Sequence, residues 1–371
     1  MTRYSFNNAV PFEATHVGEV INEELIARGM RQSELARLTG IQKSILNDVI
    51  KGKRGLTCEM ALLLEKVLGI SSTYLMNIQT QYELDCAKQS ERVVLQSKML
   101  DIWKVLKDNV SISFFRKENI VKGNIIEDVK RIFDVFSVDN LDDFFGLKAK
   151  EMELSYYRKS DKVKTNPVDI LSWKYYCYYI SKNDRSSLCP FNKDADVNAL
   201  TRELNSVFKD NRDTVNKTTK VLNKYGIRFF VVNKVGQVPV DGMSFWIGDA
   251  PTIVVTERIA TIDNFAFTVF HEVGHVFKHI TKDGGAMINL MDNKKCIEEL
   301  EADEFALNAI LPSADWRKFM LKNRNVAPYM MASPIQDEAC RYNVNPQILF
   351  GRYKHDIGIY KLKKFFETKI L

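Results

Sequence analysis

One apolar stretch that contains ionisable residues constrains this chain more than any other feature. Residues 263–280 read DNFAFTVFHEVGHVFKHI, and the spacing of their apolar side chains predicts a single helix. Within it, residues 271–275 read HEVGH and use two of the five histidines of the chain. An ionisable group is costly to bury without a partner. The fold must therefore bring compensating groups to this helix.

The spacing within HEVGH indicates a metal site. His271 and His275 are four residues apart, which places both imidazoles on one face of a helix, where they can bind the same Zn²⁺. Glu272 would then lie beside the metal. Zinc lowers the pKa of water, and a carboxylate in this position can accept the proton as a general base. The motif predicts a zinc site with Glu272 as its catalytic residue; the alternative is the polar face of an ordinary helix.

A catalytic zinc usually takes a third protein ligand and keeps a fourth position open. The best source is a second predicted helix, IEELEADEFA at residues 297–306, because its small residues would allow close packing on the first. We expect Glu299 to be this ligand, with Glu298 and Glu301 as competitors. Asp303 is expected to lie behind the ligands and orient them. His279 is expected to do the same or to be a core histidine, and its i, i+4 spacing from His275 leaves a ligand role as the alternative.

Short helical patterns separated by glycines fill residues 16–82. They predict helices at 16–28, 32–38, 42–51 and 57–68, and a fifth from about Ser72. Gly40 stands where the second and third helices must turn sharply. The residues spaced for the buried faces of these two helices are Leu35, Ala36, Ile41, Ile45, and Val49 or Ile50. The pattern predicts a helix-turn-helix inside a five-helix bundle.

The third of these helices presents a polar face suited to DNA. The side chains expected to reach base edges or phosphates in a major groove are Gln42, Lys43, Ser44 and Asn47. A neighbouring basic cluster suited to phosphates consists of Lys51, Lys53 and Arg54. Gln32 could donate to a further phosphate. A plain helical hairpin with a solvated face is the alternative.

The rest of the chain predicts two further domains. Residues 90–182 stay helical and rich in aromatic side chains, which we expect to face a core rather than stack on bases. The polar segment at 182–196 predicts a boundary, followed by a helix to about Asn223 and strands at 227–232 and 252–256. The predicted fold class is multidomain, mainly α with an α+β part. Its domains are a DNA-binding bundle (1–88), a helical connector (89–189) and an α+β zinc domain (190–371).

Composition sets outer bounds on the class of protein. The length of 371 residues predicts two or three domains, and the net charge is +6. Residues 1–90 hold ten basic and ten acidic residues, so the excess lies elsewhere, much of it near the C-terminus, and does not support the DNA argument. The six cysteines form no CxxC pair and are expected to be reduced. No apolar run suits a membrane helix or a signal peptide, so we expect a cytoplasmic protein without membrane partners.

The N-terminal motifs resemble a known family. Residues 18–84 resemble the Xre/Cro family, and more closely its HigA-type antitoxins. The resemblance implies a lambda-repressor-like bundle that binds double-stranded operator DNA as a homodimer. It also implies the toxin of a toxin–antitoxin pair as a possible partner.

The C-terminal motifs resemble the ImmA/IrrE metallopeptidase family. They are YYRKS (156–160), DGMSFW (241–246), PTIVVT (251–256), the HEVGH helix (263–279), ELEADEFALNAILP (299–312) and NPQILFGRYKH (345–355). The resemblance implies a zincin-like domain that uses Zn²⁺ to cleave partner repressors. Asp303 departs from it, since asparagine is commoner there. Tyr353 and His355 are weak candidates for an oxyanion stabiliser because they lie in a shared motif.

Two functions fit these features. The first is a DNA-binding regulator whose zinc domain cleaves a partner repressor or its own chain. The second is an antitoxin-like repressor whose zinc domain is structural or senses a ligand. A purely structural site has no use for a carboxylate beside the metal, so Glu272 favours the enzyme.

Overall fold

The computed structural model describes residues 14–156, 166–236, 240–257, 260–282, 287–290, 297–359, 361, 365–366 and 368–370. The chain divides into two compact units, Met1–Asp101 and Ile102–Leu371. Helices predominate in both, and the second also holds a small sheet, which confirms the predicted fold class. The three-domain division with boundaries after residues 88 and 189 stays a prediction. None of the described helices is long and apolar enough to cross a membrane.

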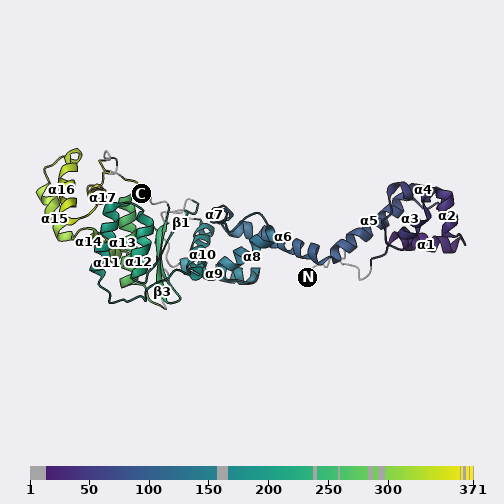
Figure 1. The fold of residues 1–371 in the computed structure, drawn as a ribbon, viewed down its shortest axis with the longest axis horizontal. Coiled ribbons are helices and arrows are strands. Elements are labelled where there is room, and N and C mark those ends of the chain that lie inside the picture. The colour runs from purple at the N-terminus through teal and green to yellow at the C-terminus, as the bar shows by residue number, and fades with distance from the viewer. Residues whose placement is uncertain are drawn as a thin grey trace. The chain divides into compact units, whose positions relative to one another are not determined.

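The first unit is built from the five predicted helices and the start of a sixth (Figure 1). These are α1 (Val17–Ala27), α2 (Gln32–Thr39), α3 (Lys43–Ile50), α4 (Cys58–Leu68), α5 (Ser72–Gln89) and α6 (Glu91–Asn109). Glycines with left-handed backbone end α2 and α4, at Gly40 (φ 71°) and Gly69 (φ 66°). Glycine adopts this conformation without steric cost, which is why the predicted helix ends match the observed ones closely.

The helix-turn-helix core is close to the predicted one. Leu35 and Val49 are completely buried, Ala36 is buried, and Ile41, Ile45 and Ile50 are half-buried around them. Leu46 is also completely buried, and the sequence reasoning did not name it. The Thr39 hydroxyl donates to the Leu35 carbonyl (2.8 Å) at the end of α2. Because the apolar residues of α3 face this core, the polar face of the helix lies outside it.

Helices of the middle region belong to the second unit. They are α7 (Ile112–Lys117), α8 (Ile125–Phe136), α9 (Leu141–Tyr156) and α10 (Pro167–Asn183). Trp173 and Tyr176 of α10 are buried, as expected of core-facing aromatics. Tyr175 and Tyr178 are half-buried and line a cavity of about 340 Å³ between α8, α10 and the end of β2. Most of the YYRKS motif lies outside the described residues.

A four-stranded sheet forms the base of the zinc-motif region. Its strands are β1 (Arg228–Val232), β2 (Val240–Ile247), β3 (Ala250–Thr256) and β4 (Met287–Leu290). Their order is β1-β3-β2-β4, with β1 parallel to β3, and β2 antiparallel to both β3 and β4. The predicted strands correspond to β1 and β3, whereas β2 and β4 were not predicted.

Helices cover both faces of this sheet (Figure 1). The helices on one side are α11 (Val197–Asp210), α12 (Thr214–Lys224), α13 (Ile262–Lys278) and α14 (Ile297–Ile310). On the other side the ring of Tyr178 packs edge-on against Phe245 of β2, with centroids 4.8 Å apart. Successive residues of a strand point to opposite faces, so Ser244 points toward α13. The prediction of one helix up to Asn223 was wrong, because left-handed Asn211 and Asp213 separate α11 from α12.

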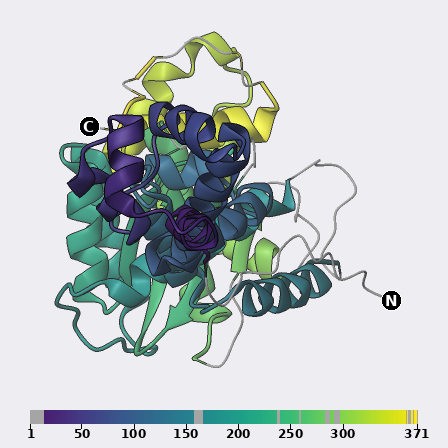
Figure 2. The ribbon, with the colours of Figure 1, turned by 90° about the vertical axis from the view of Figure 1, so that its right-hand side faces the viewer.

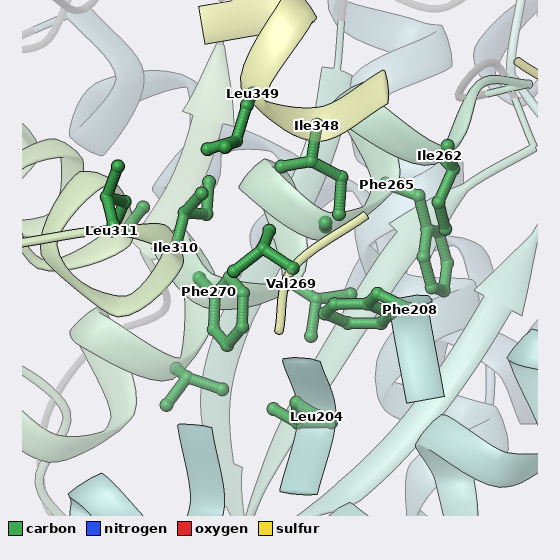
Figure 3. Packing of buried hydrophobic residues seen from close by; sticks show 14 of the residues in the cluster. Leu204, Phe208, Ile262, Phe265, Val269, Phe270, Ile310, Leu311, Ile348 and Leu349 are labelled. Atoms are coloured by element: carbon green, nitrogen blue, oxygen red, sulfur yellow. The ribbon is translucent and has the colours of Figure 1, made fainter. Parts of the chain in front are cut away.

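The largest core surrounds α13. Figure 3 shows Phe265, Val269 and Phe270 of this helix packed among side chains of α11, α14 and the final helix. Those partners are Leu204, Phe208, Ile310, Ile348 and Leu349, together with Leu311, which directly follows α14. The apolar side chains of α13 are thus buried in this core, and their packing fixes the direction in which the histidine face of the helix points.

Three helices complete the chain: α15 (Ser313–Lys322), α16 (Ala332–Tyr342) and α17 (Pro346–Ile357), with a 3₁₀ turn at Pro328–Met330. Figure 2 shows these helices, coloured yellow, above the green strands of the same unit. Arg352 of α17 is buried and donates to the carbonyls of Leu307 and Leu311 (2.8 Å each) at the end of α14. Part of the C-terminal basic excess is therefore structural, whereas Lys363 and Lys364 lie outside the described residues.

Close packing of α1 on the end of α3 predicts an effect of one added methyl group. A Cβ on Gly18 would lie 2.3 Å from the Val49 carbonyl oxygen and 2.6 Å from that of Ile50. We expect Gly18→Ala to destabilise the bundle by about 1–3 kcal/mol, because the backbone of α1 or α3 must move to make room for the added methyl group. Hydrogen exchange of the α3 amides in the full chain should accelerate by about 5- to 150-fold, the factor that corresponds to this loss of stability. Exposed Glu23→Ala on the same helix is the control, and equal exchange in the two variants would contradict this packing.

Candidate metal centre

Helix α13 brings its two motif histidines to the buried face of α14. His271 and His275 are 2% and 1% exposed. Their Nε2 atoms lie 3.0 Å apart, within hydrogen-bonding distance of each other. The i, i+4 spacing of the two histidines thus brings both Nε2 atoms to the same place on one face of the helix.

Glu299 of α14 completes a three-donor group with these histidines. One of its carboxylate oxygens is 3.2 Å from His271 Nε2, and the other is 3.5 Å from His275 Nε2. Donor atoms around a tetrahedral zinc, at about 2.0–2.2 Å from it, stand about 3.3–3.6 Å apart. The three donor separations of 3.0, 3.2 and 3.5 Å run from slightly below this range to within it, and two imidazoles with one carboxylate are a donor set that suits Zn²⁺.

The approach of α14 to α13 depends on small residues. Ala302 and Ala306 of α14 are completely buried, and a Cβ on Gly274 would lie only 3.1 Å from the ring of Phe305. The predicted inward face of α14 therefore packs directly on the motif helix. Glu299 stands on this face, whereas Glu298 is half-buried and Glu301 is exposed.

Asp303 lies behind His271, on the side of the ring away from the three-donor group. Its carboxylate accepts a hydrogen bond from His271 Nδ1 at 2.8 Å. Burial by itself lowers the pKa of His271, but the hydrogen bonds to Asp303 and Glu299 outweigh it and raise that pKa well above its usual range. Burial raises the pKa of Glu299, and its contacts with His271 and His275 reverse this and lower it. These opposite pKa shifts favour the charged form of each group.

Glu272 is completely buried against strand β2. The Ser244 hydroxyl donates to its Oε2, and a Cβ on Gly242 would come within 2.5 Å of Oε1. Oε1 has no hydrogen-bond partner among the described residues. Burial raises the pKa of Glu272, and the nearby His271 and His275 oppose this shift. A buried carboxylate with one uncommitted oxygen is suited to accept a proton.

Sequence reasoning missed Ser244 and Gly242 as neighbours of Glu272. Both lie in the DGMSFW motif, but the motif was not assigned to a strand, so the direction of its side chains was unknown. Tyr353 is buried against Phe350 in the core, and His355 is exposed beside Asp356. Neither touches the three donors in any described contact, so nothing here supports an oxyanion role for them.

Six of the eight predicted DNA-contacting residues are exposed, and two are half-buried. Gln42, Lys43 and Ser44 are exposed at the start of α3, and Asn47 is half-buried one turn later. Gln32, at the start of α2, is half-buried. The basic residues that follow α3, all exposed, are Lys51, Lys53 and Arg54.

Fold and site together define a helix-turn-helix protein with a metallopeptidase-like domain. A helix-turn-helix family model matches residues 21–75, and a model of the IrrE N-terminal-like domain, a peptidase family, matches residues 223–334. The chain therefore belongs to the helix-turn-helix family and carries an IrrE N-terminal-like domain. The second match contains all three candidate ligands and Glu272.

Individual relatives cover only part of the chain. Virulence-associated protein I of Dichelobacter nodosus is 30% identical over 82 residues, which are 22% of this chain and 76% of the relative. An uncharacterized HTH-type transcriptional regulator of Haemophilus influenzae is 28% identical over 71 residues, 19% of this chain and 66% of the relative. Among solved structures, Pseudomonas aeruginosa antitoxin HigA with higBA promoter is 28% identical and covers 20% of this chain and 84% of its own, with a TM-score of 0.20. An antidote protein of the HigA family from Coxiella burnetii is 25% identical, with coverages of 23% and 95% and a TM-score of 0.22.

The geometry predicts which of the adjacent glutamates holds the metal. Glu299→Gln should weaken Zn²⁺ binding by at least about 100-fold, because the neutral amide removes the charged donor. Glu298→Gln, one residue earlier and outside the donor group, is the matched control and should bind like the wild type. Zinc affinity is measured by competition with a chromophoric chelator. Equal affinities in the two variants would contradict the assignment of Glu299.

Proposed function

We propose that this chain is a transcription regulator that binds operator DNA as a homodimer and cleaves a protein with its zinc-dependent C-terminal domain. The protein cleaved would be a partner repressor or the chain itself. Binding to DNA would place the protein in the cytoplasm. The single observation that carries the peptidase claim is the Glu272 carboxylate, buried with an uncommitted oxygen beside the three-donor group.

The proposed ligands are His271, His275 and Glu299, oriented by groups behind them. When bound, Zn²⁺ would polarise a peptide carbonyl and activate water. Ser244 holds Oε2 of Glu272, which leaves Oε1 to take a proton from water and deliver it to the leaving amine. The burial of the site lowers the local dielectric, which strengthens each of these charge interactions.

The low solvent exposure of the same site favours a second candidate function. Glu272 is 0% exposed and the three donors are at most 7% exposed, so the described conformation offers little access to a peptide. A structural or ligand-sensing zinc in an antitoxin-like repressor with a toxin partner would accommodate this burial. The carboxylate beside the donors still favours the peptidase, because a structural site gains nothing from it.

The peptidase proposal predicts a separation of zinc binding from cleavage. Glu272→Gln should keep stoichiometric zinc and lose about 100-fold or more of the cleavage rate, because a general base typically contributes that much. Cleavage is assayed by mass spectrometry on the chain itself and on co-expressed products of adjacent genes. Glu304→Gln, an exposed glutamate on α14, is the matched control. Zinc-loaded wild type that cuts none of these proteins while it retains operator binding would favour the second function instead.

The DNA proposal predicts the loss of sequence-specific binding from the face of α3. Lys43→Ala combined with Asn47→Ala should abolish specific retention of promoter DNA from the chain's own gene, since each good base contact contributes about 1–3 kcal/mol. Lys66→Ala, an exposed lysine on α4, tests the loss of a single charge elsewhere in the bundle. Unchanged retention by the double variant would refute the recognition-helix assignment.

A further inference from the structure

A chain of hydrogen bonds continues from His275 away from the donor group. His275 Nδ1 lies 2.9 Å from His279 Nδ1, and His279 Nε2 lies 2.9 Å from a carboxylate oxygen of Glu301. His279 is the C-cap residue of α13, where its backbone N–H donates to the His275 carbonyl. Glu301 belongs to α14, so this chain of contacts joins the two helices a second time.

When a cation occupies the donor group, only one arrangement of protons gives every hydrogen bond in this series one donor and one acceptor. A cation takes the lone pair of His275 Nε2, the atom that faces His271 and Glu299, so the proton of His275 is on Nδ1. That N–H needs an acceptor, and His279 Nδ1 is in place to accept it. His279 then carries its own proton on Nε2 and donates it to the Glu301 carboxylate. Each nitrogen has one defined role.

The two motif histidines are thus supported from the same helix in different ways. Asp303 contacts His271 directly at 2.8 Å, whereas Glu301 reaches His275 only through the ring of His279. The side chain of His279 is 9% exposed, so its contact with His275 is shielded from water. Glu301 is 49% exposed, and an exposed polar contact of this kind contributes little stability alone. Its effect is therefore expected on the orientation of His275 rather than on folding.

We infer that His279 and Glu301 are positioning residues that fix the tautomer and ring orientation of His275 for metal binding. The inference rests on the proposed metal centre and adds to it the group that completes the support of the second histidine. It also gives Glu301, considered above as a competing ligand, a different role. Partners of this kind typically change metal affinity by 10- to 100-fold.

The test compares Zn²⁺ affinity, by chelator competition, in variants of the full chain. His279→Leu removes both hydrogen bonds and should weaken zinc binding by about 10- to 100-fold. His279→Gln can accept through its oxygen and donate through its nitrogen, so it should recover most of the loss. Glu301→Ala should weaken binding in the same direction, and exposed Glu304→Ala on α14 should not change it.

A second readout separates positioning from folding. The visible spectrum of bound Co²⁺ should shift in His279→Leu and Glu301→Ala and be restored in His279→Gln, while the melting temperatures of the metal-free proteins stay within a few degrees. Wild-type zinc affinity in both His279→Leu and Glu301→Ala would overturn the inference. If His279→Leu does not fold, Glu301→Ala decides alone. Absence of stoichiometric zinc in the wild type would instead overturn the proposed metal centre itself.

Discussion

The contact between α13 and α14 at Gly274 is the interaction on which the rest of the site depends. Phe305 packs so closely on Gly274 that an added Cβ would lie 3.1 Å from its ring, and Ala302 and Ala306 are completely buried on the same helix. Larger residues here would hold the helices apart. Since Glu299 precedes these residues on α14, the same contact sets its distance from the two histidines.

Burial of so many ionisable groups in one place has a clear physical cost. Four of them, His271, Glu272, His275 and Glu299, are at most 7% exposed. The contact between His271 and Glu299, which shifts the pKa of each toward its charged form, offsets part of this cost, and Asp303 and Ser244 supply further hydrogen bonds. Glu272 Oε1 stays without a partner among the described residues. A buried group left in this state is expected where function requires it.

Much of this arrangement can be predicted from the sequence, because its signals are local. Glycine ends α2 and α4, the HEVGH spacing places two imidazoles on one face, and small residues identify the face of α14 that carries Glu299. The misses have physical reasons as well. Strand β2 is covered on both faces, since Gly242–Phe245 are all buried, and only the register of this strand brings the polar Ser244 against Glu272. The break between α11 and α12 uses left-handed Asn211 and Asp213 rather than glycine or proline. Glu301 was ranked only as a ligand, because its path to His275 requires the ring of His279.

The central claim is that the motif histidines and Glu299 hold one zinc ion between them. Diffraction from zinc-loaded crystals, collected on both sides of the zinc absorption edge, tests it most directly. The account predicts a single strong anomalous peak between His271 Nε2, His275 Nε2 and the carboxylate of Glu299. A peak elsewhere in the chain, or no peak at this position in crystals that contain stoichiometric zinc, would contradict it.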